Sequence, residues 1–122
     1  MTELIAFLSS GKGTWGHVSR LMDGMNNQQW EQIYLLTNQF GKEKFTPEKK
    51  NVELIALSED IGLRELRDEI LDCITKKVKG NEVAVNFISG TGKEHMALLS
   101  ALIKSGKGFR MIALTKDGIE EV

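Results

Sequence analysis

The segment Val83-Ala-Val-Asn-Phe-Ile-Ser-Gly-Thr-Gly-Lys-Glu-His95 decides the fold, because its pattern changes abruptly from one kind of structure to another. Its first half is an apolar, β-branched run that is typical of a strand buried on both faces. Its second half breaks into Ser89-Gly-Thr-Gly-Lys93 and continues into a helical run. We therefore expect a strand, a tight turn and a helix, which together form the repeating unit of an α/β protein.

The turn from Ser89 to Lys93 also has the composition of a phosphate or nucleotide site. Glycine lets backbone N–H groups approach a ligand closely, and the helix N-terminus beyond the turn favours negative charge. The hydroxyls of Ser89 and Thr91 and the ammonium of Lys93 add further hydrogen-bond donors. The alternative is a purely structural turn, because glycine and serine are common wherever a chain bends tightly.

The rest of the chain repeats the alternation of apolar strands and amphipathic helices. This order implies right-handed crossovers and a mostly parallel sheet of about five strands, covered on both faces, within a single domain over residues 1–122. The segment 40–51 has no clear apolar period, so a short helix and an irregular loop are both open, and the tail from residue 115 is short and acidic. The predicted strands are 4–8, 33–37, 52–57, 82–88 and 109–114, and the predicted helices include residues 15–25, 63–78 and 96–103.

The composition is that of a soluble globular protein with little net charge. Sixteen Lys and Arg residues against seventeen Asp and Glu residues leave a formal charge of −1, so no overall field attracts duplex nucleic acid or a membrane surface. Cys73 is the only cysteine, which excludes an internal disulfide and a cysteine-rich metal site. No stretch approaches the roughly 18 apolar residues of a membrane span, and no basic segment precedes the first apolar run. We therefore expect a cytoplasmic protein.

A second glycine-rich turn, Gly11-Lys-Gly-Thr-Trp-Gly16, follows the first predicted strand and fits the GxGxxG pattern of dinucleotide-binding proteins. Such proteins usually carry an acidic residue at the end of the second strand to hold ribose hydroxyls, whereas this strand ends in Thr37-Asn-Gln39. Trp15 is also bulky for a position close to a pyrophosphate. An NAD(P)- or other dinucleotide-binding enzyme that uses Gly11, Gly13 and Gly16 is therefore the alternative function.

Ligands of open parallel sheets bind beyond the carboxyl ends of the strands, near the point where the strand order reverses. We expect the loops 9–16, 37–39 and 89–93 to meet at that edge, with 115–116 as a further candidate. His17 and His95 lie just inside helices that begin there, so acid–base chemistry and simple capping are both open for them. No third residue has metal-ligand spacing, so we expect no metal. First-turn charges that complement a helix dipole are expected at Glu59, Asp60 and Glu65.

The stretch from Val83 to Met96 resembles the fourth strand, the hydroxyl-Gly-Gly-Thr-Lys turn and the following helix of the CARF domain. CARF domains are the Rossmann-like sensors of CRISPR systems, and they bind cyclic oligoadenylates. Ile33-Tyr-Leu-Leu-Thr-Asn38 and the hydroxyl pair Ser9-Ser10 add to the resemblance. The turn reads Ser-Gly-Thr-Gly-Lys where the family commonly has Thr-Gly-Gly-Thr-Lys. The resemblance implies a stand-alone Rossmann-like three-layer sandwich.

The resemblance further implies a homodimer in which the first-strand and fourth-strand loops of both subunits surround a cyclic oligoadenylate, without any cofactor, in type III CRISPR antiviral signalling. Both a plain binder and a metal-independent ring nuclease fit it. In a ring nuclease Lys93 would stabilise the developing charge, Ser9 or Ser10 would orient the phosphate, and His95 or His17 would move protons. The implied ligand-binding residues are Ser9, Ser10, Gly11, Lys12, Thr14, Trp15, Asn38, Ser89, Gly90, Thr91, Gly92 and Lys93, with Thr14, Trp15 and Asn38 toward the bases.

Overall fold

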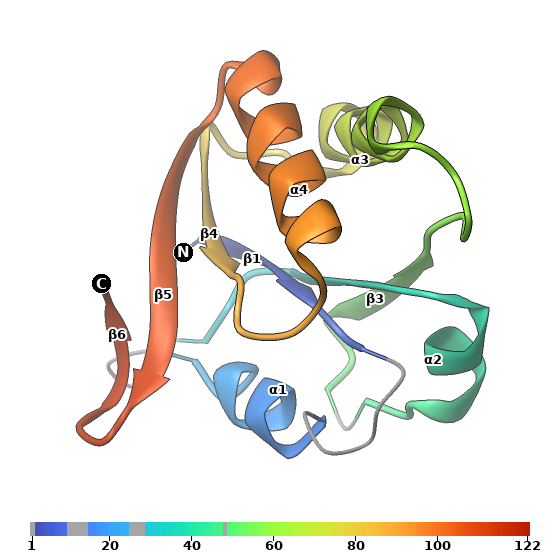
Figure 1. Ribbon diagram of the computed structural model, residues 1–122. Helices are drawn as coiled ribbons and strands as arrows, with labels where there is room; N and C mark the ends of the chain where they lie inside the picture. Colours follow the sequence, from blue (N-terminus) through green and yellow to red (C-terminus); the bar gives the residue numbers. More distant parts are fainter. Residues whose placement is uncertain (1, 10–14, 25–28, 48) are drawn as a thin grey trace.

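The computed structural model describes residues 2–9, 15–24, 29–47 and 49–122. Its sheet has the strand order β3-β2-β1-β4-β5-β6, and helices cover both faces (Figure 1). The first five strands are parallel, and β6 runs antiparallel to β5. The α/β fold with a mostly parallel sheet is confirmed and is Rossmann-like, but the sheet has six strands instead of about five. The strands are β1 (Glu3–Phe7), β2 (Ile33–Thr37), β3 (Val52–Ala56), β4 (Glu82–Asn86), β5 (Gly108–Thr115) and β6 (Gly118–Glu121), and the helices are α1 (Trp15–Leu21), α2 (Gln39–Lys44), α3 (Leu63–Lys77) and α4 (Gly92–Ser105).

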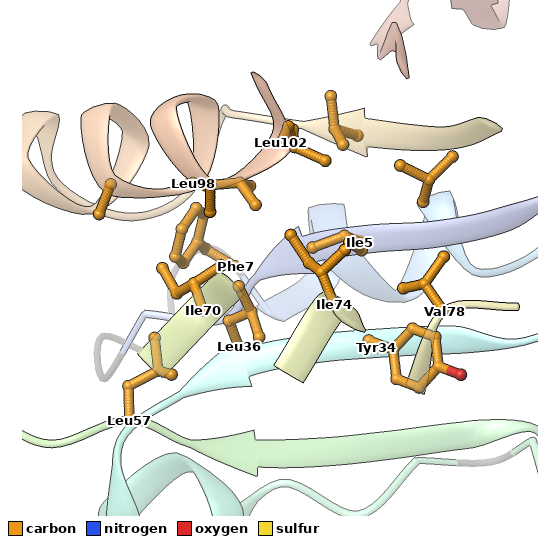
Figure 2. Close-up of a cluster of buried hydrophobic side chains, with 14 of the residues drawn as sticks. Ile5, Phe7, Tyr34, Leu36, Leu57, Ile70, Ile74, Val78, Leu98 and Leu102 are labelled. Carbon is orange, nitrogen blue, oxygen red and sulfur yellow. The ribbon is translucent and has the colours of Figure 1, made fainter. Parts of the chain in front are cut away.

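Alternate side chains of the central strands fill two apolar layers, because successive residues of a strand point to opposite faces. On the face shown in Figure 2, Ile5 and Leu36 meet Ile74 of α3 and Leu98 of α4. The opposite face packs against α1 through residues such as Val18. β1 and β2 are buried along their whole length, whereas β3 is only half-buried because it lies at an edge of the sheet.

The strand β6 was not expected from the acidic tail. It forms a hairpin with β5 around Lys116 and Asp117, and Gly118 adopts a φ of 108°. The Thr115 hydroxyl accepts a hydrogen bond from the Asp117 N–H (3.1 Å) and donates one to the Gly118 carbonyl (3.1 Å). Asp-Gly after an apolar run is a common hairpin signal, because glycine tolerates positive φ. The expectation of about five strands therefore missed this sixth strand.

Two other elements end earlier than their apolar patterns suggested. α1 stops at Leu21, short of the predicted end at residue 25, and Gly24 then takes a φ of 98°, which turns the chain out of the helix. β4 stops at Asn86 and not at residue 88. The Asn86 amide donates to the Ile112 carbonyl (2.8 Å) and accepts from the Ile88 N–H (3.2 Å). These side-chain bonds replace the strand ladder and start the turn toward α4.

Candidate functional site

The carboxyl ends of β1 and β4 lie next to each other at the centre of the sheet, where the strand order reverses. The Ser9 N–H donates to the Ser89 hydroxyl oxygen at 3.0 Å. Ser89 is only 2% exposed, so this hydroxyl lies inside the junction. The contact joins two turns that are 80 residues apart in the chain. The prediction that these turns meet at one edge of the sheet is confirmed.

A cavity of about 360 Å³ opens beside this junction, over the ends of β1, β2 and β3 and the first turn of α4. Its volume lies within the roughly 300–1,000 Å³ of small-molecule sites. Leu8, Leu57 and Leu66 contribute apolar surface, whereas most of the remaining lining is polar. The polar lining residues are Ser9, Thr37, Asn38, Ser58, Glu59, Asp60, Thr91, Lys93 and Glu94.

One wall of the cavity is the beginning of α4, which is closed by a capping box. The Thr91 hydroxyl accepts from the Glu94 N–H (3.2 Å), and the Glu94 carboxylate accepts from the Thr91 N–H (2.8 Å). The helical hydrogen bonds begin with the His95 N–H, which donates to the Thr91 carbonyl at 2.9 Å. The N–H groups of Gly92 and Lys93 therefore precede the helical ladder, as at any helix N-terminus, and have no acceptor among the described residues.

The two glycines of this turn have different roles. Gly90 has a φ of 103°, and a Cβ there would lie 3.2 Å from Phe7 Cγ and 3.3 Å from His95 Nε2. The fold therefore requires glycine at position 90. At Gly92 a Cβ would meet nothing within 4 Å, so packing within the described chain does not explain this glycine.

Lys93 is exposed and reaches across the cavity mouth. Its ammonium donates a hydrogen bond to the Ile61 carbonyl, in the segment between β3 and α3. A neutral carbonyl is a weaker partner for an ammonium than an anionic oxygen is. Lys93 is the one cation in the cavity lining that the structure describes.

The opposite wall is acidic and is organised by Asn38. The Asn38 side-chain oxygen accepts from the Gly41 N–H (2.8 Å) and caps α2. The Asn38 amide nitrogen donates to Glu59 Oε1 at 3.2 Å. Both ends of this amide are thus occupied by the chain itself. The Glu59 side chain also lines the cavity, and its carboxylate keeps acceptor capacity beyond the bond from Asn38.

Glu59 and Asp60 were not recognised as cavity residues from the sequence, where they were expected to be first-turn charges of the following helix. That expectation was wrong for both, because α3 begins at Leu63 after an N-cap at Gly62. It was right for Glu65, which lies in the first turn. Glu59 and Asp60 follow the third strand closely, and this position was the signal that could have placed them at the ligand edge of the sheet.

Two aromatic or imidazole side chains among the predicted site residues brace the turns. The Trp15 indole N–H donates to the Ser9 carbonyl (2.9 Å), and its ring packs edge-on against Phe45. The His95 ring lies 5.5 Å from Phe7 and 5.4 Å from Phe87, centroid to centroid, and its Nε2 is 2.8 Å from the Ser89 carbonyl oxygen. Both side chains hold the β1 and β4 turns in place.

Several predicted site residues cannot be located relative to this cavity. Ser10, Gly11, Lys12, Gly13 and Thr14 lie outside the described residues. Gly16, the last glycine of the GxGxxG pattern, is an exposed residue of α1.

No protein-family model, curated protein or solved structure matches this chain. Within the described ranges, three or more His, Cys, Asp or Glu side chains do not gather in a way that could hold a metal ion. Those ranges also contain no helix with the length and apolar character needed to cross a bilayer.

Proposed function

We propose that this protein binds a cyclic oligoadenylate at the cavity beside the β1 and β4 turns, and that two copies of the chain enclose the ligand. One observation carries the proposal. The two turns that resemble those of the CARF family are joined at the switch point of the sheet, through Ser9 and Ser89 at 3.0 Å, beside the first turn of α4. Switch points are where open α/β sheets bind nucleotides.

The α4 wall supplies the phosphate contacts in this proposal. The open N–H groups of Gly92 and Lys93 and the dipole of a helix of 14 residues favour an anionic oxygen at this point. The Lys93 ammonium exchanges the Ile61 carbonyl for the phosphate, because a hydrogen bond between two charged groups is the stronger one. Thr91 and Glu94 act indirectly, since their side chains hold the helix N-terminus in place.

The size of the cavity and the surface of α4 support a dimer. A volume of about 360 Å³ suits a single nucleotide unit and not a whole ring, so a second subunit supplies the rest of the enclosure. Met96 and Ile103 on α4 and Ile88 in the preceding turn are 59, 66 and 60% exposed. Met96 and Ile103 are seven residues apart and so share one face of α4, and exposed apolar side chains on one face are typical of interaction surfaces. A symmetric ring on a two-fold axis would then make each contact twice.

Cleavage of the bound ring is part of the proposal as a metal-independent ring nuclease activity. In this reaction a ribose 2′-hydroxyl attacks the neighbouring phosphate, the 5′-oxygen of the next nucleotide leaves, and the proton of the 2′-hydroxyl ends on that oxygen. The step requires in-line geometry at the phosphate and a cation for the developing charge, which is the role proposed for Lys93. Ser10 stays the candidate that orients the phosphate. His95 is assigned a bracing role in place of proton transfer, because its ring is packed between two phenylalanines and bonded to the Ser89 carbonyl.

Dinucleotide binding is the second candidate, and the strand order favours it. The order β3-β2-β1-β4-β5 is the one found in dinucleotide-binding sheets, with the glycine-rich turn after β1. The residue that would hold the ribose at the end of β2 is Asn38, and both ends of its amide are already bonded within the chain.

A binding experiment separates the two candidates. Thermal unfolding would be followed with cyclic tetra-adenylate, cyclic hexa-adenylate, NAD⁺ and NADP⁺, each at several concentrations. A ligand at 100 times its Kd should add roughly 2.7 kcal/mol to the free energy of unfolding. We expect stabilisation by a cyclic adenylate, strongly reduced in Lys93→Ala and retained in Lys104→Ala, a lysine in the last turn of the same helix. Stabilisation by NAD⁺ or NADP⁺ alone would overturn the proposal in favour of the second candidate.

The dimer has its own test in light scattering coupled to gel filtration. We expect two chains per particle for the wild type and one for Met96→Glu, because a carboxylate placed in an apolar contact would lose its water. Lys104→Glu introduces the same charge outside the apolar set and should remain dimeric. A monomeric wild-type protein that binds one ring per chain would contradict the two-copy arrangement.

A further inference from the structure

The two walls of the cavity differ in charge, and this difference says more about the ligand than the volume does. On the first wall, the Lys93 ammonium and the N-terminus of α4 balance the Glu94 carboxylate, which accepts from the Thr91 N–H, whereas the described residues of the second wall carry the two carboxylates of Glu59 and Asp60 and no cation of their own. A phosphate is attracted to the first wall and repelled from the second. A ligand that fills the cavity must therefore present hydrogen-bond donors to the acidic wall.

We infer that Glu59 accepts a hydrogen bond from a ribose 2′-hydroxyl of the ligand, so that the site selects ribonucleotide rings over deoxyribonucleotide rings. This inference rests on the proposed function. In a ring joined through 3′ and 5′ oxygens, the 2′-hydroxyl is the one donor that every ribose retains. A carboxylate at a strand end is the group that dinucleotide sites use for ribose hydroxyls. Here the carboxylate comes from the end of β3, one strand further from the centre than in those sites.

Glu59 is the better candidate of the two acidic residues because its side chain is oriented. Asn38 donates to Glu59 Oε1 at 3.2 Å, and Asn38 is itself held by the Gly41 N–H at 2.8 Å. The end of β2 and the first turn of α2 thus position a carboxylate that belongs to the next strand. One carboxylate accepts several hydrogen bonds, so the bond from Asn38 leaves capacity for a ligand hydroxyl. Asn38 acts as the positioning residue.

The ratio of two affinities tests this inference. The Kd values of cyclic tetra-adenylate and of cyclic tetra-deoxyadenylate would be measured for the wild type and for Glu59→Gln. A hydrogen bond to a charged group contributes roughly 1.5–3 kcal/mol, which corresponds to about tenfold or more in affinity. We expect the wild type to prefer the ribose ring by about tenfold or more, and Glu59→Gln to lose most of this preference. The ratio cancels any general change in phosphate affinity that follows from removing a negative charge.

Two further variants sharpen the test. Asn38→Asp keeps an oxygen to cap α2 but replaces the bond to Glu59 by repulsion, so the preference should fall although Glu59 is present. Glu65→Gln removes an acidic charge from the first turn of α3, outside the cavity lining, and should keep the full preference. Melting temperatures of all variants without ligand show whether the fold is retained.

Each outcome has one meaning. A Glu59→Gln variant that still prefers the ribose ring, or that loses affinity equally for both rings, would overturn the hydroxyl contact while leaving the proposed function in place. A ring of inosine nucleotides lacks the adenine amine. If the wild type binds this ring as weakly as Glu59→Gln binds the adenine ring, the carboxylate contacts the adenine amine and not the 2′-hydroxyl, and the inference is overturned. Failure of the wild type to bind either ring would overturn the proposed function and this inference together.

Discussion

Both ends of the sheet carry polar residues, but at the amino end they are buried and bonded within the chain, whereas at the carboxyl end they line a cavity. At the amino end, the Glu3 carboxylate is 4% exposed and accepts hydrogen bonds from the Lys79 and Gly80 N–H groups, at 3.0 and 2.8 Å. The Tyr34 hydroxyl donates to the Lys77 carbonyl at 2.8 Å, and its oxygen also lies 3.3 Å from Glu3 Oε2. At the carboxyl end, Lys93 has a backbone carbonyl as its partner and faces a cavity about twice as large, about 360 Å³ against about 190 Å³.

The difference shows at which end of a parallel α/β sheet polar groups are available to a ligand. Helix C-termini and their carbonyls collect at the amino end, and here Lys107 and Tyr34 supply donors to the carbonyls of Gly80 and Lys77. Helix N-termini with open N–H groups collect at the carboxyl end. Buried polar groups that are saturated by the chain contribute to stability, whereas groups left facing a cavity are available to a ligand. Substitutions at the two ends should therefore affect different measurements.

The largest effect on stability is expected at Glu3. Glu3→Ala removes a buried carboxylate that accepts from the Lys79 and Gly80 N–H groups, so the free energy of unfolding should fall by about 3 kcal/mol. Urea unfolding followed by circular dichroism measures this. Glu31→Ala, an exposed carboxylate at the same end, should change it by less than about 0.5 kcal/mol. Equal losses in the two variants would remove the distinction between the two ends.

A smaller loss of stability is expected at Ser89, at the carboxyl end of the sheet. Ser89→Ala removes the acceptor of the Ser9 N–H and should cost about 1–2 kcal/mol of unfolding free energy. Because the serine is buried, its loss should weaken ligand binding only by loosening the turn. Ser89→Cys has a similar size with a weaker acceptor, and should lie between the wild type and Ser89→Ala in both urea midpoint and affinity. A full loss of ligand affinity at unchanged stability would show that Ser89 contacts the ligand directly.

The pH dependence of stability should also report on the amino end. Burial and the nearby Glu3 carboxylate raise the pKa of Tyr34 from 10.0 to about 12. The folded state therefore keeps the phenolic proton that the unfolded state releases, and stability should fall between pH 10 and 12, on the order of 1 kcal/mol. Tyr34→Phe should show a flatter profile over that range, in urea unfolding at pH 9 to 12.

A background slope of the same sign is expected from Cys73, because burial raises its pKa from 9.0 to about 11. The Cys73→Ala variant measures that part separately. If the profile of Tyr34→Phe is as steep as that of the wild type, the buried phenol does not couple to folding.

The smallest effect on stability is expected from substitution of Lys93, which should instead weaken ligand binding. Its ammonium is exposed and bonded to a carbonyl, so Lys93→Ala should change the unfolding free energy by less than about 0.5 kcal/mol. The same variant should bind cyclic tetra-adenylate at least about tenfold more weakly, since it removes a charged hydrogen-bond donor. Fluorescence titration and urea unfolding on one preparation give both numbers. A large loss of stability would place Lys93 with the structural residues.

The sequence by itself determined the α/β class, the parallel strands β1 to β5 and the helices α3 and α4. Apolar runs and helical periodicity depend on local geometry that each segment carries within itself. It also predicted that the turns at Ser9 and Ser89 share one edge, because parallel strands align their carboxyl ends. The Asp117-Gly118 pair, a local turn signal, precedes and starts β6.

Only the tertiary structure decided which polar side chains are hydrogen-bonded within the chain and which face the cavity. Ser89, Thr91 and Asn38 look like ligand-binding residues in the sequence, yet each hydrogen-bonds to a backbone N–H of the chain, at Ser9, Glu94 and Gly41. Glu59 looks like a helix-dipole charge, yet it lies on a cavity wall. A hydrogen bond between residues 21 or 80 positions apart leaves no local pattern, because its partners are brought together by packing and not by spacing.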